Sequence, residues 1–298
     1  MHIAVTGSQG LIGTALVEAL TGAGHRVTRL VRRPPGAGEV RWDPAGGEID
    51  AAALGGTDAF IHLAGVGIGD HRWTDEHKRA VIDSRVQGTT LLSRTIASLS
   101  PRPAVLVSAS AIGYYGDRGD EVLSEDSGAG TGFLAEVCQQ WERATAPAED
   151  AGERVVHTRT RLVMSSAGGA LKQMLLPFRL GAGGRIGSGK QWWSWISIDD
   201  EVGAIQHVIG DDGVRGPVNL VAPSPVRNAE FTKTLGLVLG RPTLLPTPTF
   251  ALKAMFGGDA VEEMFLGGQR VAPAGLEASG YSFRHPELEA ALRHVLGR

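Results

Sequence analysis

The sequence is poor in cysteine. One cysteine stands among 298 residues, which excludes a disulfide framework and a cysteine-based zinc site. No apolar run approaches the roughly 18 residues of a membrane helix, and no basic-then-apolar leader precedes the first expected strand. The formal net charge of -3 is small and mildly acidic, which argues against a nucleic-acid partner. We therefore expect a cytoplasmic protein with neither a membrane nor a nucleic acid as partner.

Lysine is also scarce, whereas glycine is abundant. Only 5 of the 29 basic residues are lysine. The arginine excess suits phosphate binding, but it equally reflects genomic base composition, which we favour as its cause. The 42 glycines are about twice the usual share of roughly 7%. They show no period of three, which excludes collagen. The apolar fraction of 42% argues against disorder, and a chain of this length can bury a core without a staple.

Short β-rich runs alternate with helical stretches in the first half of the chain. Such alternation is typical of parallel βαβ units, and it predicts an α/β fold with a Rossmann-type doubly wound sheet. We expect a Rossmann domain over 1–163, to which later segments return, and a smaller lobe over 164–298. Pro147 should bend or end the last helix of the first half. The expected strands are 2–6, 27–31, 59–63, 104–107 and 155–158, and the expected helices are 11–21, 75–98 and 133–149.

A glycine-rich segment follows the first expected strand directly. It reads Thr-Gly-Ser-Gln-Gly-Leu-Ile-Gly and opens the first expected helix. Gly7 allows a tight turn, Gly10 lets the backbone approach a pyrophosphate, and Gly13 allows close packing of helix and strand. The helix begins at Leu11 and Ile12, where free N–H groups and a partial positive charge suit phosphate. This arrangement predicts a dinucleotide site rather than a plain strand–helix turn.

The second expected strand ends in Val31, Arg32 and Arg33. A protein that selects NAD usually places an acidic residue here, which accepts hydrogen bonds from the ribose 2′-OH. Two arginines suit a 2′-phosphate instead, because charge-assisted bidentate contacts favour it. We predict NADP as the cofactor. The alternative is a solvated basic turn.

Several motifs together resemble the extended short-chain dehydrogenase/reductase superfamily. The glycine-rich turn, His-Leu-Ala-Gly at 62–65 and Arg-Val-Gln-Gly-Thr at 85–89 carry this resemblance. Further motifs at 72–74, 84–86, 108–116, 141–142, 177–179, 195–200 and 267–271 are similar to those of its atypical "epimerase family" group. This group is related to nucleotide-sugar epimerases, and the match covers essentially the whole chain.

The resemblance implies a Rossmann domain that binds NADP. Arg85 would reach the cofactor from the long helix, which is physically plausible because arginine donors persist at any working pH. We favour these cofactor roles over the structural alternatives, in which Arg85 is an ordinary helix-surface arginine and 62–65 an ordinary strand end. The positions that the resemblance assigns to the cofactor are Val31, Arg32, Leu63, Ala64, Gly65, Arg85 and Leu162.

Two residues depart from the family pattern near the nicotinamide end. Arg161 stands where the family usually has glycine after the fifth expected strand, and it would contact a phosphate or partly block the pocket. Ser197 stands where a histidine usually precedes Asp199 and Asp200. We interpret this acidic pair as the N-terminal cap of the following helix rather than as catalytic groups.

The usual catalytic pair of the superfamily is absent. Working members generally carry Tyr-x-x-x-Lys, whereas the residues four positions after Tyr114, Tyr115 and Tyr281 are Arg, Gly and His. A proton donor must lie within hydrogen-bond reach of the substrate or act through one water. The candidates are Ser110, Tyr114, Tyr115 and Glu136.

Each of these candidates has a structural alternative. Ser110 is equally a backbone cap, Tyr114 and Tyr115 are aromatics packed over the sheet, and Glu136 is a solvated helix carboxylate. We expect Trp192, Trp193, Trp195 and the glycine loop around Arg185 and Lys190 to line a small-molecule cleft or to pack in the core. His71 and His77 have poor spacing for a metal, so we expect no metal site.

Two functions are consistent with this pattern. The first is an NADP-dependent oxidoreductase or epimerase that acts on a small molecule with a non-standard acid/base set. The second is a catalytically degenerate NADP-binding sensor or regulator. The intact dinucleotide motif supports both, the missing pair favours the second, and an aromatic cleft favours the first. The expected partner is a small-molecule substrate of unknown identity, and a homodimer is left open.

Overall fold

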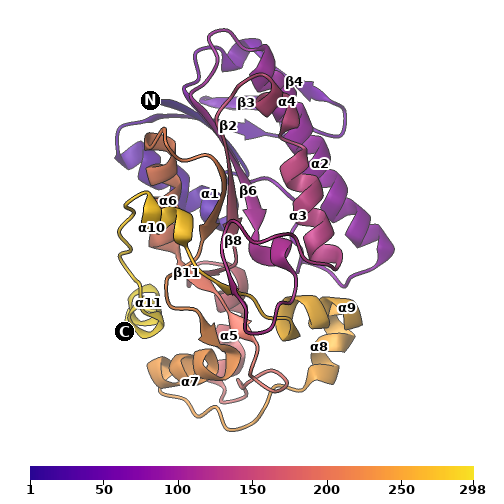
Figure 1. The fold of residues 1–298 in the computed structure, drawn as a ribbon, viewed down its shortest axis with the longest axis vertical. Helices are drawn as coiled ribbons and strands as arrows, with labels where there is room; N and C mark the ends of the chain where they lie inside the picture. The colour runs from indigo at the N-terminus through magenta and orange to yellow at the C-terminus, as the bar shows by residue number, and fades with distance from the viewer.

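A sheet of eight strands forms the centre of the fold in the computed structural model, which describes all residues from 1 to 298 (Figure 1). The strand order is β12-β8-β6-β5-β1-β2-β3-β4, and every pair is parallel except β3 with β4. The chain leaves β1 toward β2 and later returns to β5 on the other side of β1. The strands are β1 (His2–Thr6), β2 (Arg26–Val31), β3 (Glu39–Asp43), β4 (Glu48–Ile49), β5 (Ala59–His62), β6 (Val105–Ala111), β8 (Val155–Thr160) and β12 (Gly216–Leu220).

Helices cover both faces of this sheet (Figure 1). Successive side chains of β1 point to opposite faces, so Ile3 and Val5 pack in one core cluster and Ala4 packs in another. The first face carries α1 (Leu11–Gly22) and α6 (Ile198–Gly210), and α2 (Asp75–Ser98), α3 (Phe133–Arg143) and α4 (Ala146–Asp150) lie on the second.

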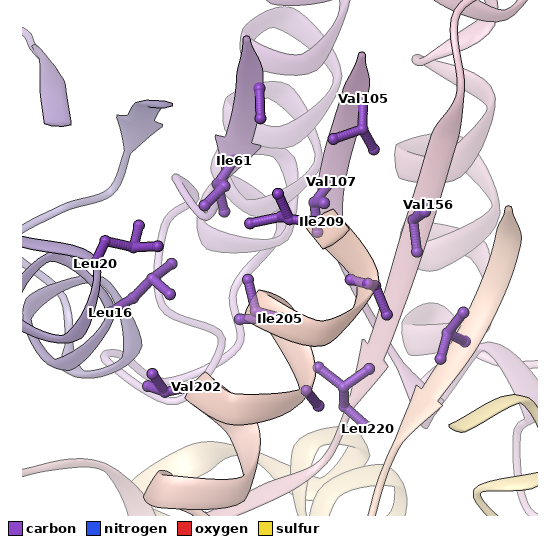
Figure 2. Close-up of a cluster of buried hydrophobic side chains, with 14 of the residues drawn as sticks. Leu16, Leu20, Ile61, Val105, Val107, Val156, Val202, Ile205, Ile209 and Leu220 are labelled. Carbon is purple, nitrogen blue, oxygen red and sulfur yellow. The ribbon is translucent and has the colours of Figure 1, made fainter. Parts of the chain in front are cut away.

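The core under α1 and α6 consists of aliphatic side chains (Figure 2). Leu16 and Leu20 from α1 meet Val202 and Ile205 from α6 above the strands, and all four are at least nine-tenths buried. Burying each such side chain contributes about 1.5–3 kcal/mol. Helix α6 comes from the second half of the chain, so this core joins the two halves of the sequence.

A smaller lobe lies at the opposite end of the molecule from β3 and β4 (Figure 1). Its core contains Trp193, Trp195, Phe178 and Phe231, together with Leu292 from the last helix. Its elements are β9 (Leu162–Met164), α5 (Gly169–Arg179), β10 (Trp192–Trp193), β11 (Trp195–Ser197), β13 (Val226–Arg227), α7 (Asn228–Leu239), α8 (Thr249–Phe256), α9 (Gly258–Val261), η3 (Glu262–Leu266) and α11 (Leu288–Val295). The remaining short elements are η1 (Ala52–Leu54), η2 (Ile112–Tyr115), β7 (Val122–Leu123), β14 (Arg270–Val271) and α10 (Ala274–Ala278).

The predicted Rossmann-type fold is confirmed, with corrections at particular elements. The single helix expected over 133–149 is two helices, because the chain breaks after Arg143 and Pro147 lies in the first turn of α4, where its missing N–H costs nothing. Strands β3 and β4 were not predicted. Beyond residue 163, β12 is an edge strand of the central sheet and α6 packs against the sheet. No helix is long and apolar enough to cross a membrane.

Candidate functional site

The glycine-rich turn lies at the carboxyl end of β1, where the strand order reverses between β1 and β5. In open α/β sheets this reversal creates the crevice that binds ligands. Gly7 has φ +66, and a Cβ there would lie 2.7 Å from the Leu63 carbonyl carbon. A Cβ on Gly13 would lie 2.2 Å from the Gly7 oxygen. Side chains are therefore excluded at both positions, whereas Gly10 faces a cavity.

The hydroxyl of Thr6 joins the ends of β1 and β5. It accepts hydrogen bonds from the N–H groups of Leu63 (3.1 Å) and Ala64 (3.3 Å) and lies 2.7 Å from Nδ1 of His62. Burial, and next the charge of Arg85, lowers the pKa of His62 to about 4. His62 is therefore neutral at physiological pH, and the pair holds the loop after β5 in place.

A cavity of about 690 Å³ opens at this edge of the sheet. It extends from the glycine-rich turn after β1 to the ends of β2 and β5. The β3–β4 turn and α2 also line this cavity, which was not predicted from the sequence, although the alternating apolar residues over 39–43 indicate a strand. Its lining residues include Gly7, Gly10, Val31, Arg32, Arg33, Asp43, Pro44, Ala45, Leu63, Ala64, Gly65, Ser84 and Gln87.

The two arginines after β2 differ in their contacts. Arg33 donates two hydrogen bonds to the carboxylate of Glu39, each 2.7 Å long, and this pairing raises the pKa of Arg33. The exposed side chain of Arg32 makes no hydrogen bond or ion pair and lines the cavity. Of the two arginines predicted to meet a 2′-phosphate, only Arg32 has a free guanidinium.

Arg85 lies behind the cavity. Its guanidinium donates to the carbonyl oxygens of Val66 (2.9 Å) and Val81 (3.1 Å) and stacks 4.7 Å from the ring centroid of Trp141. Burial lowers its pKa to about 10, so it stays charged at neutral pH. It is not an ordinary surface arginine, because its relative exposure is 8%. In this structure it supports the loop after Gly65, and direct contact with a cofactor stays a prediction.

Three other predicted cofactor residues, Leu11, Ile12 and Leu162, do not line the cavity. Leu11 and Ile12 form the first turn of α1, which carries no acidic residue that would neutralise the positive end of the helix. Both side chains pack against the core on the α1–α6 face of the sheet. Leu162 begins β9 and packs against the core of the smaller lobe.

Two of the four candidate proton donors belong to a buried polar network. Ser110 donates to Glu142 (2.7 Å), and Glu142 accepts two hydrogen bonds of 2.8 Å from Arg159. Arg159 also donates to the hydroxyl of Tyr115 (3.0 Å), which itself donates to Asn219 (2.7 Å). Burial, first of all, raises the pKa of Tyr115. The hydroxyl protons of Ser110 and Tyr115 are therefore both engaged in hydrogen bonds.

The remaining two candidates differ from each other. Tyr114 is half-buried with its ring 3.5 Å below the Arg159 guanidinium, and its hydroxyl makes no hydrogen bond. Glu136 is exposed on α3 and accepts a hydrogen bond from Gln140 (3.0 Å). Ser110, Tyr114 and Tyr115 therefore gather around the Glu142–Arg159 pair, whereas Glu136 lies apart from them.

A second cavity, of about 270 Å³, lies next to η2 and the start of α3. Glu263 lines it and accepts hydrogen bonds from the first two N–H groups of α3, at 2.9 and 2.8 Å. Gln269 also lines it; this residue is 97% buried and its Oε1 has no hydrogen-bond partner. The lining contains no lysine or arginine. Its residues are Gly113, Gly116, Asp117, Thr131, Leu134, Glu262, Glu263, Leu266, Gly267 and Gln269.

The prediction that Trp192, Trp193 and Trp195 line a small-molecule cleft is wrong. Trp193 and Trp195 are core residues with exposures of 2% and 0%, as the packing alternative allowed. Trp192 lies between the guanidinium groups of Arg227 (4.5 Å) and Arg270 (4.6 Å). None of the three lines either cavity described above, because Trp193 and Trp195 pack in the core of the smaller lobe and the half-buried Trp192 is held by two arginines.

The two departures from the family pattern have structural roles. Arg161 donates to the Met264 carbonyl oxygen in η3 (3.1 Å), and burial lowers its pKa to about 10. The cap of α6 is Ser197 rather than the acidic pair, since its hydroxyl accepts from the N–H of Asp200 (3.0 Å) and donates to its carboxylate (2.8 Å).

The fold and its crevice define a dinucleotide-binding protein of the Rossmann type. The chain belongs to the NAD dependent epimerase/dehydratase family, whose model matches residues 3–220. A second model, a domain of unknown function designated DUF1731, matches residues 247–295.

Similar proteins cover the whole chain. The epimerase family protein Mb2239 of Mycobacterium bovis is 46% identical and covers 99% of this chain and 98% of its own length. The human epimerase family protein SDR39U1 is 40% identical, with 99% of this chain and 100% of its own length covered. A crystal structure of human SDR39U1 with NADPH has a TM-score of 0.93, with 38% identity and 100% and 99% of the two chains covered.

Proposed function

We propose that this protein binds NADP(H) in the 690 Å³ cavity and uses it for hydride transfer to a small molecule, as an oxidoreductase or an epimerase. The observation that carries the proposal is the cavity itself. It combines a glycine-rich turn, the free guanidinium of Arg32 and the backbone after β5 at the reversal of strand order. The similar human protein SDR39U1 is known with NADPH, which supports the choice of cofactor.

The residues present fit such a cofactor. Gly7 and Gly13 leave room for the turn to fold tightly, and Gly10 leaves backbone open to the cavity. The N–H groups at the start of α1 would hold the phosphates, and Arg32 would hold a 2′-phosphate. When bound, the cofactor supplies a hydride donor or acceptor. The residues of the chain bind the cofactor, orient the substrate against it and exclude water.

The second cavity supports a small substrate. It holds about 270 Å³ and has carboxylates from Asp117, Glu262 and Glu263 in its lining but no cation. A diphosphate would find no charge partner there, so uncharged carbonyl compounds fit the lining better than nucleotide sugars do. Tyr114 is the remaining proton-donor candidate whose hydroxyl is free.

The second candidate function is an NADP(H)-binding sensor or regulator. It is favoured by the engagement of Ser110 and Tyr115 in the buried polar network. A protein in which these groups hold the fold together has fewer groups left for acid/base work.

Turnover of bound NADPH separates the two functions. We expect loss of nicotinamide absorbance with at least one member of a panel of aldehydes, ketones and enones, with nucleotide sugars as the contrasting set. Gly13→Ala should bind no cofactor and serves as the blank. Gly22→Ala is its matched control, since a Cβ there meets nothing within 4 Å. Tight NADPH binding without turnover of any compound would favour the sensor.

Arg32 should determine the preference for NADPH over NADH. Arg32→Ala is expected to weaken NADPH binding by about 10- to 100-fold, since a charge-assisted hydrogen bond contributes about 1.5–3 kcal/mol. NADH binding should change little. Arg33→Ala is the matched control: its guanidinium is held by Glu39, so the effect on the ratio should be much smaller. Calorimetric titration with NADPH and with NADH measures the ratio of the two affinities. An unchanged ratio in Arg32→Ala would contradict the role of Arg32 in binding the 2′-phosphate.

A further inference from the structure

Three side chains from distant parts of the sequence meet at the surface between α6 and α11. Asp199 lies in the first turn of α6, His285 lies in the loop before α11, and His294 lies near the end of α11. One ligand atom from each lies within 4.8 Å of the other two. No sequence motif connects them, because 85 residues separate Asp199 from the nearer histidine.

The two imidazoles are held face to face beside the carboxylate. Their ring centroids are 4.3 Å apart, with an interplanar angle of 26°. Nε2 of His294 lies 2.9 Å from the Oδ2 atom of Asp199, and Nε2 of His285 lies 3.9 Å from the same oxygen. The latter distance is too long for a hydrogen bond, and the ring of His285 makes no other one. One ring nitrogen directed at the carboxylate therefore lacks a partner.

The backbone around the cluster is fixed. The buried carboxylate of Asp200 accepts hydrogen bonds from the N–H groups of Arg284 (2.7 Å) and His285 (2.9 Å) and from the Tyr281 hydroxyl (3.1 Å). These bonds hold His285 against the start of α6, next to Asp199. The backbone of His285 is thus positioned before any ion binds, which lowers the entropic cost of binding.

We propose that Asp199, His285 and His294 form a site for a late first-row divalent cation such as Zn²⁺, Co²⁺ or Ni²⁺. Two imidazole nitrogens and one carboxylate oxygen are the donors that these ions prefer, whereas Mg²⁺ and Ca²⁺ prefer oxygen alone. Bonds of about 2.0–2.1 Å in a tetrahedron place ligand atoms roughly 3.3–3.5 Å apart. The two nitrogen–oxygen distances of 2.9 and 3.9 Å bracket this range, so small side-chain rotations complete the site and leave a fourth position for water.

The ion would join the two cores of the protein. Helix α6 contributes Val202 and Ile205 to the core under the central sheet, and α11 contributes Leu288 and Leu292 to the core of the smaller lobe. A cation between them would fasten the C-terminal helix to the sheet. The site lies apart from both cavities, since none of its three residues lines either one. Its role is structural.

Cobalt and zinc titrations of tag-free, full-length protein test this site. We expect one Co²⁺ per chain, with the visible absorption of a bound ion, displacement by Zn²⁺ and a higher melting temperature with Zn²⁺ than with chelator. His294→Ala and Asp199→Asn should weaken binding by at least about tenfold. His71→Ala is the matched control, because His71 and His77 are also neighbouring imidazoles, with centroids 5.5 Å apart in an edge-to-face arrangement, outside the cluster.

Loss of Co²⁺ binding in His294→Ala can be distinguished from loss of the fold. The side chain of His294 is 52% exposed, so circular dichroism and the melting temperature in chelator should match those of the unmodified protein. Equal Co²⁺ affinity in His294→Ala, loss of binding only in His71→Ala, or no stoichiometric Co²⁺ uptake by the unmodified protein would each overturn the site.

Discussion

Arg159→Leu is expected to lower the free energy of unfolding by about 3–5 kcal/mol, because it leaves the carboxylate of Glu142 buried without its charge partner. Arg159 donates two hydrogen bonds of 2.8 Å to Glu142, and the two side chains are 4% and 13% exposed. Burial opposes the charge of Arg159, but the hydrogen bonds and charge of Glu142 outweigh it and raise the pKa of the guanidinium. Urea unfolding measures the loss.

A double-mutant cycle distinguishes this pair from ordinary packing. The variant that combines Arg159→Leu with Glu142→Leu should recover much of the loss, because no charge then remains buried. Strictly additive single effects would contradict the assignment. Arg293→Leu is the matched control: it removes an ion pair with Glu289 in which the two side chains are 45% and 48% exposed, so it should cost at most about 1 kcal/mol.

The Glu142–Arg159 pair also bears on function. Glu142 also accepts the Ser110 hydroxyl hydrogen, and Arg159 also donates to Tyr115. If these side chains only support the fold, the conservative variant Glu142→Gln should bind NADPH as tightly as the unmodified protein does. Loss of turnover without loss of NADPH binding would instead place Ser110 or Tyr115 in the chemistry.

Glu201→Gln is expected to remove a large part of the pH dependence of stability. Glu201 is 1% exposed in α6; its Oε1 accepts a hydrogen bond from Thr160 (2.9 Å), and its Oε2 has no partner. Burial raises the pKa of this carboxyl to about 8. The folded protein therefore holds a proton that the unfolded chain releases near pH 4.5, so this stabilisation is complete below that pH and is lost as the pH rises through about 8.

The free energy of unfolding is expected to fall by about 3–6 kcal/mol between pH 4.5 and 9, because the pKa rises from 4.5 in the unfolded chain to about 8 in the folded protein and each pH unit between them costs about 1.4 kcal/mol. Denaturant unfolding of the unmodified protein and Glu201→Gln at matched pH values isolates this contribution. Glu136→Gln, at an exposed carboxylate of α3, should leave the slope unchanged. Parallel pH profiles for the unmodified protein and Glu201→Gln would show that Glu201 ionises as it does in water.

Local patterns predicted most of the central sheet and missed its edge. The buried strand at 2–6 and the glycines after it were readable because apolar runs and turn glycines are local signals. Strand β4 has two residues, too few for any period, and the β3–β4 turn is recognisable as part of the cavity only in space. The break between α3 and α4 was expected at Pro147, but its position depends on packing.

The sequence by itself determined the Rossmann-type sheet, the glycine-rich turn that opens α1 and the absence of a Tyr-x-x-x-Lys pair, since each is a matter of residue type and short spacing. Only the tertiary structure decided which arginine after β2 is free, because Glu39 binds Arg33. It also decided that Ser110 and Tyr115 are already hydrogen-bonded, and that Asp199 meets two histidines from the C-terminal segment. These outcomes depend on side-chain contacts that the folded chain creates, most of them between residues far apart in the sequence, and a local pattern does not encode such contacts.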